Sequence, residues 1–338
     1  MKPSVTVFVP CYNEENTIYG LLDSLSKQTY PLNKLEVLII DGHSTDNTLN
    51  QIDQFKNHHS ELPIRVINNP HRQIPHALNI GCNSASGEIL LRMDAHSIPS
   101  ENYVELCVEG LILKKGDNIG GKWKIVPSKS SGVAKAIAIA AAHPLGSGGA
   151  SYRSGNDAKH VDTVPFGCFF RITYRKVGPF DESLLANEDY EWNYRLIESG
   201  GKIWFDPNIV CNYLARADLP SLAKQYRNYG YWKRQMLSKY PSSLRLRQAL
   251  PVLLVLMLSL ALLLLAIGVI TSSTFLTWAG VMMILSHPFL IIISFIKERT
   301  GITLLNFSLV VASLMTIHIS WGYGFLWRSL KFLVKKNS

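Results

Sequence analysis

The last third of this 338-residue sequence contains almost no charge. Between residues 249 and 326 the only charged side chains are those of Lys297, Glu298 and Arg299. The apolar segments that remain are residues 249–270, 275–296 and 302–326, each at least 22 residues long. Because a helix of about 20 residues crosses a hydrocarbon core of roughly 30 Å, these lengths predict three transmembrane helices. Buried helices of a large soluble core are the alternative.

Cysteine is scarce, and its five positions show none of the short spacings that are typical of metal sites. No signal-peptide pattern is found at the N-terminus, so we expect reduced cysteines in a cytoplasmic domain. The simplest interpretation is that all five are small buried apolar side chains. They are Cys11, Cys82, Cys107, Cys168 and Cys211.

Basic residues outnumber acidic ones overall, but not in the N-terminal two-thirds. The chain carries a net charge of +9, whereas residues 1–213 carry about −3. The basic excess lies in residues 216–247 and in a basic tail, residues 327–338, on either side of the apolar segments. This distribution argues against a nucleic-acid partner and indicates attraction to membrane lipids with anionic headgroups. We expect a multi-pass protein of the inner cell membrane with a cytoplasmic N-terminal domain.

The sequence allows the C-terminus to lie on either side of the membrane. Three spans would place it outside the cell, yet a basic tail favours the inside. A break in the second apolar segment near Pro288 would resolve the conflict, because proline interrupts the hydrogen bonds of a helix. The sequence leaves both topologies open.

Apolar runs alternate with helical patterns through the N-terminal domain, residues 1–213. The predicted strands are "SVTVFVP", "LEVLIIDG", "IRVIN" and "GEILLRMD". Continuous apolar strands that alternate with helices form a mainly parallel sheet with both faces covered, and ligands bind beyond the carboxyl ends of its strands. We predict a single Rossmann-like α/β domain. A basic amphipathic segment, residues 214–248, joins it to the transmembrane region.

Polar residues follow the fourth predicted strand. In "LLRMDAHS" the side chains of Asp94 and His96 point to the same side, because residues i and i+2 of a strand do so. A carboxylate and an imidazole together suit a divalent cation, with Mn²⁺ a better match than Mg²⁺. A capping aspartate beside a surface histidine is the alternative, which this pair alone does not exclude.

Asp41 and Tyr12 follow the second and first predicted strands. An acid at a strand end accepts hydrogen bonds from a nucleotide base or ribose, and a tyrosine there stacks on a base. The alternative for Asp41 is a turn that leads into a helix N-cap, which "DGHSTD" also fits. Both interpretations can hold, because different residues would serve each.

Glu188 and Asp189 lie in "NEDYEWNYRLIESG", directly after the predicted N-cap Asn187. In the first turn of a helix the dipole favours ionised carboxylates, and an ionised carboxylate can act as a general base. Ordinary capping is the alternative.

The ordered series "VPCYNEE", "IIDGHSTDNT", "NIGCNSASGEILLRMDAH", "VPFGCFFRITYRKVGPFDESL" and "NEDYEWNYRLIESGGKIWFDP" resembles the family 2 inverting glycosyltransferases, which have the nucleotide-sugar-binding type A fold. The resemblance covers about residues 4–213. "VAKAIAIAAAHPLGSGG" followed by "HVDTVPFGCF" is similar to the membrane-attached exopolysaccharide glucosyltransferases of the succinoglycan type. This implies a hexosyltransferase that moves a sugar, glucose from UDP in that subgroup, to a hydroxyl of a polyprenyl-linked glycan acceptor.

The resemblance also implies a role for each residue that matches the family's motifs. On the donor side, Tyr12 and Glu14 contact the base and the ribose, and Asp41 contacts the base. Arg72 supplies a basic residue near the donor, and Pro10 ends the strand that presents this motif.

The remaining motifs imply which residues bind the metal ion and which residue is the catalytic base. Asp94 contacts the sugar nucleotide, and His96, together with Asp94, holds a divalent cation, either Mn²⁺ or Mg²⁺. Asp189 is the catalytic base, with Glu188 beside it toward the acceptor. The acceptor hydroxyl attacks directly, so that no protein nucleophile is needed and the configuration inverts. The acceptor-side residues are Gln225, Arg227 and Tyr229.

Three positions depart from the family's pattern. Gly42 stands where a second aspartate is frequent, and His96 replaces a carboxylate, which leaves the metal preference open. Processive members carry Gln-x-x-Arg-Trp, but the last two positions hold Asn228 and Tyr229 here. This difference argues against a synthase that makes long polymers.

Other interpretations remain. A catalytically inactive nucleotide-sugar-binding scaffold or regulator would retain the same fold. A transporter subunit would need polar residues in its spans, and His287, Asn306 and His318 are the main candidates. The segment "GVAKAIAIAAAHP", residues 132–144, suits either a helix at the membrane interface or a core helix.

Overall fold

The computed structural model describes residues 2–296 and 304–336. Its contacts divide the chain into two compact units, each described here by itself. The N-terminal unit contains residues 1–125 and 150–214, and the C-terminal unit contains residues 126–149 and 215–338. Residues 126–149 thus group with the C-terminal helices, whereas the sequence analysis places them in the catalytic domain. The functional boundary at residue 213 stays a prediction.

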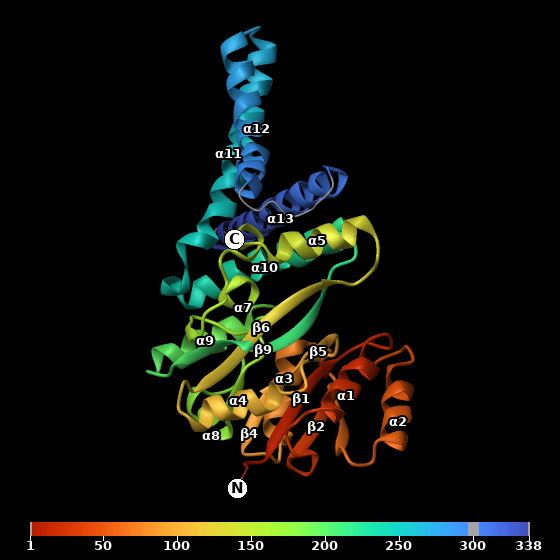
Figure 1. Ribbon diagram of the computed structural model, residues 1–338. Coiled ribbons are helices and arrows are strands. Elements are labelled where there is room, and N and C mark those ends of the chain that lie inside the picture. Colours follow the sequence, from red (N-terminus) through yellow and green to blue (C-terminus); the bar gives the residue numbers. More distant parts are fainter. Residues whose placement is uncertain (1, 297–303, 337–338) are drawn as a thin grey trace. The chain divides into compact units, whose positions relative to one another are not determined.

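A sheet of nine strands forms the centre of the described fold, with most of it in the N-terminal unit (Figure 1). Its first four neighbours, in the order β3-β2-β1-β4, are parallel. The strands are β1 (Val5–Cys11), β2 (Leu35–Asp41), β3 (Ile64–Asn68), β4 (Ile89–Arg92), β5 (Ser97–Pro99), β6 (Asn118–Pro127), β7 (Lys159–His160), β8 (Cys168–Phe170) and β9 (Ile203–Ala215). The predicted α/β class with its parallel strands is confirmed. The antiparallel pairs that β8 makes with β4 and β6 extend the sheet in a way that the sequence analysis does not predict.

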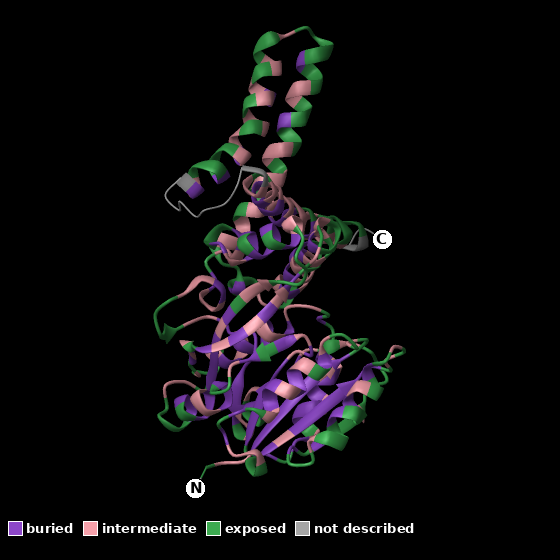
Figure 2. Cartoon of the chain, turned by 45° about the vertical axis from the view of Figure 1, so that its right-hand side comes forward, coloured by how far each residue is buried: buried purple, intermediate pink, exposed green. Residues whose placement is uncertain are grey.

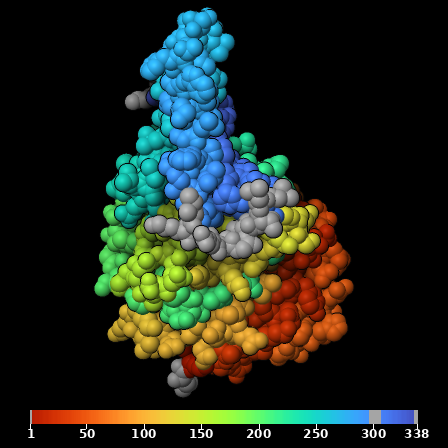
Figure 3. All heavy atoms as spheres, turned by 45° about the horizontal axis from the view of Figure 1, so that its top comes forward, coloured from red at the N-terminus to blue at the C-terminus, as the bar shows by residue number. Residues whose placement is uncertain are grey.

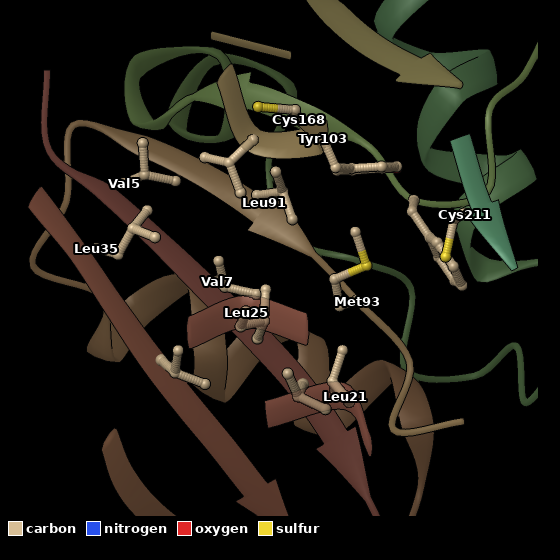
Figure 4. Close-up of a cluster of buried hydrophobic side chains, with 14 of the residues drawn as sticks. Val5, Val7, Leu21, Leu25, Leu35, Leu91, Met93, Tyr103, Cys168 and Cys211 are labelled. Atoms are coloured by element: carbon tan, nitrogen blue, oxygen red, sulfur yellow. The ribbon is translucent and has the colours of Figure 1, made fainter. Parts of the chain in front are cut away.

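Successive residues of each strand point to opposite sides of the sheet, so apolar side chains lie on both of its faces. Helices cover both faces. Val7 packs in one core and its neighbour Phe8 packs in the other, and both are fully buried. One core contains residues of α1 (Ile18–Ser26), α2 (Thr48–His58) and α4 (Tyr103–Ile112), and Figure 4 shows part of it. The other contains residues of α3 (Ile74–Ser84), α8 (Arg171–Val177) and α9 (Glu188–Glu198). The shorter elements of this unit are a 3₁₀ turn, Leu32–Lys34, and α7 (Ser151–Ser154).

All five cysteines are buried and free, as the sequence predicts. Cys11, Cys107, Cys168 and Cys211 belong to the first core, and Cys82 belongs to the second. They therefore serve as small apolar side chains of the fold.

The C-terminal unit consists of helices. They are α5 (Gly132–Ala142), α6 (Pro144–Ser147), α10 (Leu219–Lys239), α11 (Leu246–Ile270), α12 (Thr274–Ile296) and α13 (Leu304–Lys336), with a 3₁₀ turn at Pro241–Ser243. α11 and α12 pack together, and α13 packs along α10 and against α5 (Figure 1). Residues 132–142 therefore form a helix that packs against α13, which favours the core-helix interpretation of that segment.

Among residues 2–296 and 304–336, three helices are long and apolar enough to cross a membrane, as predicted. α12 is continuous through Pro288, so the break that was one of the two open alternatives is not found at that residue. α11 and α12 expose apolar side chains along their length, whereas β1, β2 and β4 at the centre of the sheet are almost wholly buried (Figure 2). Phe275, Trp278, Met282 and Phe289 lie on the outer surface of α12, which is light blue in Figure 3.

The third helix differs from the other two. Of its most apolar window 33% is buried, against 11% for each of α11 and α12, because α10 and α5 cover one side of it. Its helical structure continues to Lys336, so the predicted basic tail begins inside the helix rather than after it. Residues 302 and 303, the predicted start of this span, and residues 337 and 338 lie outside the described residues.

Candidate active site

The carboxyl ends of β1, β2 and β4 meet at one edge of the sheet. β1 pairs in parallel with both neighbours, and Cys11 at its end lies opposite Asp41. The backbone N–H of Gly42 donates to the carbonyl of Cys11 at 2.8 Å, and that of Met93 donates to the carbonyl of Phe8 at 3.1 Å. The loops that carry the predicted donor residues therefore begin side by side.

Hydrogen bonds join the first two of these loops. The backbone N–H of Asn13 donates to Ser44 Oγ at 2.9 Å, and that of Glu14 donates to Thr48 Oγ1 at 2.8 Å. Asn13 and His43 adopt the left-handed backbone conformation, with φ values of 53° and 60°. Such conformations in non-glycine residues are concentrated at functional sites, where the surrounding contacts maintain them. These contacts hold the loops in a fixed relation to each other.

The predicted donor-binding residues differ in the solvent exposure of their side chains. Tyr12, just after Pro10 and Cys11, is 45% exposed, and the Arg72 guanidinium lies 6.0 Å from the centre of its ring. Asp41 is only 6% exposed, and Ser44 donates to its carboxylate from both the backbone N–H, at 3.1 Å, and the hydroxyl, at 2.6 Å. Tyr12 thus has a face open for stacking, while Asp41 stabilises the turn that follows it.

Glu14 and His96 contact each other across the site. Glu14 Oε1 lies 3.1 Å from His96 Nδ1. With Glu14 ionised, Nδ1 carries the proton and donates to it, which places the lone pair of the imidazole on Nε2. Carboxylates orient metal-binding histidines in this way.

A buried arginine connects two of the predicted motifs. Arg92, the last residue of β4, is 6% exposed; its Nε donates to Asp94 Oδ1 at 3.1 Å and its Nη1 donates to Glu188 Oε1 at 3.0 Å. The sequence analysis does not select Arg92, although a basic residue inside the apolar run "ILLRM" is a signal that could have identified it. Glu188 is 5% exposed and bound to Arg92 of β4, and its role toward the acceptor stays a prediction.

Asp189 begins α9 together with Glu188. Its Oδ1 accepts a hydrogen bond from the backbone N–H of Tyr190 at 2.7 Å. Burial, followed by the charge of Glu188, raises the pKa of Asp189 to about 7, although Arg92 acts in the opposite direction. Asn187 is the N-cap residue, as predicted, and its carbonyl accepts from the backbone N–H of Glu191 at 2.9 Å, but its φ is 65° and its side chain makes no capping hydrogen bond. A carboxyl group with a pKa near 7 suits a general base.

The structure places the predicted acceptor-side residues on α10, in the C-terminal unit. Gln225 Nε2 donates to the hydroxyl of Tyr229 at 3.0 Å, and the side chain of Arg227 is exposed. Their role toward the acceptor stays a prediction.

No group of three or more metal-ligating side chains occurs among residues 2–296 and 304–336. Asp94 is paired with Arg92, and His96 is oriented by Glu14. This set fits a cation that takes most of its ligands from a bound diphosphate and water, as Mg²⁺ sites in nucleotide enzymes do, with His96 and Asp94 as the protein ligands. It does not form a complete protein cage.

Comparisons with known proteins identify the family. The family described as Glycosyl transferase family 2 matches residues 6–177. The succinoglycan biosynthesis protein ExoA of Rhizobium meliloti (strain 1021) is 31% identical over 254 residues, which cover 73% of this chain and 74% of that protein. A dolichyl N-acetyl-alpha-D-glucosaminyl phosphate 3-beta-D-2,3-diacetamido-2,3-dideoxy-beta-D-glucuronosyltransferase of Methanococcus voltae is 30% identical over 239 residues, 70% of this chain and 74% of that protein. The chain belongs to glycosyltransferase family 2, and it is a glycosyltransferase of glycan biosynthesis, as the sequence predicts.

Solved structures agree on the fold. The mannosyltransferase PcManGT from Pyrobaculum calidifontis, in complex with GDP-Man and Mn²⁺, has a TM-score of 0.60 at 16% identity and covers 95% of this chain and 87% of its own. S. aureus TarS 1–349, in complex with UDP-GlcNAc, has a TM-score of 0.51 at 18% identity and covers 71% and 72%. The predicted type A fold is confirmed.

The raised pKa of Asp189 predicts how transfer depends on pH. Only the ionised carboxylate accepts a proton, so the rate should rise as the pH increases through about 7. An ordinary aspartate is already ionised at pH 5. We expect a roughly tenfold increase in the transfer rate between about pH 6 and pH 8, measured at saturating donor. A rate that is constant from pH 5 to 8 would contradict this role.

Proposed function

We propose that this enzyme is an inverting hexosyltransferase. It transfers a sugar, glucose by resemblance, from a nucleoside diphosphate sugar, UDP by resemblance, to a hydroxyl of a polyprenyl-linked glycan. The observation that carries this proposal is the position of Asp189 in the first turn of α9, next to Glu188, which Arg92 joins to Asp94 at the end of β4. The similarity to ExoA supports a role in cell-surface polysaccharide biosynthesis.

In the proposed reaction Asp189 removes the proton of the acceptor hydroxyl as that hydroxyl attacks the sugar. The attack comes from the face opposite the diphosphate, so the configuration at the sugar carbon inverts and no covalent enzyme intermediate forms. A positioned general base contributes about 10² to 10⁴ to the rate. Tyr12 and Arg72 hold the base of the donor, while the buried Arg92 fixes Asp94 relative to α9.

The leaving diphosphate gains negative charge. His96 and Asp94 would hold a divalent cation, Mn²⁺ or Mg²⁺, which supplies Lewis-acid stabilisation of that charge when it is bound. The contact of Glu14 with Nδ1 would orient the imidazole of His96 toward the cation. This assigns Glu14 to the orientation of the imidazole, in addition to the ribose contact that the resemblance implies.

We further propose that the enzyme is anchored in the inner membrane by α11, α12 and α13, with its catalytic unit in the cytoplasm. The length and composition of the three helices and the basic residues around them support this location. The relative from Methanococcus voltae has a dolichyl sugar phosphate in its name, which supports a polyprenyl-linked acceptor for this chain as well.

The Glu14–His96 contact predicts the effect of two substitutions on Mn²⁺ binding. His96→Ala should abolish cation binding in the presence of nucleoside diphosphate, and Glu14→Gln should weaken it about tenfold, because the amide oxygen of glutamine is a weaker acceptor than a carboxylate and orients the imidazole less strongly. Electron paramagnetic resonance of free Mn²⁺ measures binding independently of turnover. Glu101→Gln, which removes an exposed carboxylate elsewhere in the N-terminal unit, is the control. Unchanged Mn²⁺ binding by His96→Ala would rule out His96 as a ligand.

The proposed activity is tested with the full chain in native-like membranes. A panel of radiolabelled nucleotide sugars is supplied together with a membrane lipid extract, with and without Mn²⁺ or Mg²⁺. We expect one donor to label the lipid fraction in a cation-dependent way. Label that stays in the water-soluble fraction with every donor would overturn the proposal.

A further inference from the structure

The C-terminal unit contains a hollow of about 470 Å³ between α10 and α13. Lys224 and Arg227 line it from α10, and Ile319 and Tyr323 line it from α13. Both basic side chains are exposed, and no ion pair of either occurs among the described residues. The hollow therefore combines two positive charges on one wall with an apolar and aromatic surface on the other.

Acidic side chains are scarce around these charges in the sequence. Neither residues 219–296 nor residues 304–336 contain an aspartate or a glutamate, and the nearest acid before Lys224 is Asp218, the N-cap of α10. Past that cap, neither of the helices that form the hollow carries a negative charge among its described residues. Arginine binds phosphate through its planar set of donors, and lysine binds it as a compact point charge.

Two glycines allow α10 and α13 to pack closely beside the hollow. A Cβ added to Gly324 would lie 2.0 Å from the carbonyl oxygen of Arg227, and one added to Gly230 would lie 2.0 Å from that of Trp321. α10 and α13 are therefore in backbone contact beside the hollow, a spacing that only glycine permits. Because this contact includes the backbone of Arg227 itself, the basic wall is fixed relative to α13.

We propose that this hollow binds the phosphate group of the polyprenyl-linked acceptor, with Lys224 and Arg227 as its ligands and α13 alongside its hydrocarbon chain. The inference rests on the proposed function, because it locates the lipid end of that acceptor. The required ligand has an anionic head and a long apolar chain, and the hollow offers both surfaces on adjacent helices. α13 is itself apolar enough to enter a membrane, which would place the hollow near the level of lipid headgroups.

The test measures binding of undecaprenyl phosphate to the full chain in phosphatidylcholine nanodiscs. The double substitution Lys224→Gln and Arg227→Gln should weaken binding at least about tenfold, because each side chain would lose a charge-assisted hydrogen bond to the phosphate. The control, Arg216→Gln with Lys239→Gln, removes the same charge from residues that do not line the hollow, and should bind as the unaltered chain does. Equal losses in the two double variants would show a general electrostatic attraction and overturn the proposal.

Two further experiments test which ligand the hollow binds and separate this site from the proposed function. Inorganic phosphate and phosphatidylglycerol should compete with undecaprenyl phosphate only weakly; competition at equal concentration by either would overturn the assignment to a polyprenyl carrier. Binding and transfer by the Lys224→Gln, Arg227→Gln variant at the level of the unaltered chain would overturn this site while leaving the proposed function intact. Failure of the unaltered chain to label any lipid would instead count against the proposed function.

Discussion

Asp189→Asn is expected to lower the rate of sugar transfer by about 10² to 10⁴, because asparagine cannot accept the proton of the acceptor hydroxyl. The substitution preserves the shape of the side chain, so the affinity for the nucleotide sugar should stay within about twofold of the original. Transfer is measured as labelled lipid, and donor binding is measured by calorimetric titration.

The matched control is Asp53→Asn, which removes an exposed carboxylate from α2 and should leave both quantities unchanged. A variant at Asp189 that transfers sugar at a near-normal rate would disprove its role as the base. Loss of donor binding together with transfer would indicate instead that Asp189 contributes to the donor site.

The same substitution should raise thermal stability. The pKa of Asp189 is raised on folding, so ionisation of this group opposes folding, and the penalty grows from about pH 4 to about pH 7. Asp189→Asn removes that penalty. We therefore expect its midpoint of thermal unfolding to exceed that of the unaltered chain by more at pH 8 than at pH 5. Loss of activity accompanied by a gain in stability is typical of a catalytic group in a buried environment.

Arg92→Met is expected to destabilise the N-terminal unit by about 3–5 kcal/mol, because it leaves the buried carboxylate of Glu188 and the half-buried carboxylate of Asp94 without their cation. The loss appears as a lower midpoint of thermal unfolding. Arg92→Lys retains the charge, but it cannot donate in two directions from a planar group, so it should recover only part of the stability.

Two controls separate this bridge from a general loss of charge. Glu188→Gln combined with Arg92→Met should be more stable than Arg92→Met alone, because one of the two uncompensated charges is removed. Arg65→Met breaks the ion pair of Arg65, which is 54% exposed, with Glu36, and should cost at most about 1 kcal/mol. If Arg92→Met were as stable as Arg65→Met, the contacts of Arg92 with Asp94 and Glu188 would not stabilise the N-terminal unit.

The sequence predicts the parallel half of the fold well, because local patterns determine it. The apolar runs at β1, β2 and β4 and the helical patterns between them match the observed elements. Since parallel strands share one carboxyl edge, the positions of Tyr12 and Asp94 at that edge follow from the order of the strands.

The sequence predicts contacts between distant residues much less well. Arg92 and Glu188 are separated by 96 positions, and no local pattern shows that one neutralises the other. The contact between Glu14 and His96 spans 82 positions and changes the interpretation of both. The local sequence also cannot show that α13 packs along α10. An apolar helix of this length is predicted to be transmembrane whether protein or lipid covers it.

The most direct test of this account is the transfer of label from a nucleotide sugar to the lipid fraction, followed by the anomeric configuration of the product. The unaltered chain should form one glycosidic bond whose configuration is opposite to that of the donor, and Asp189→Asn should form almost none. A product that retains the configuration of the donor, or an equal yield from Asp189→Asn, would contradict an inverting transfer in which Asp189 is the base.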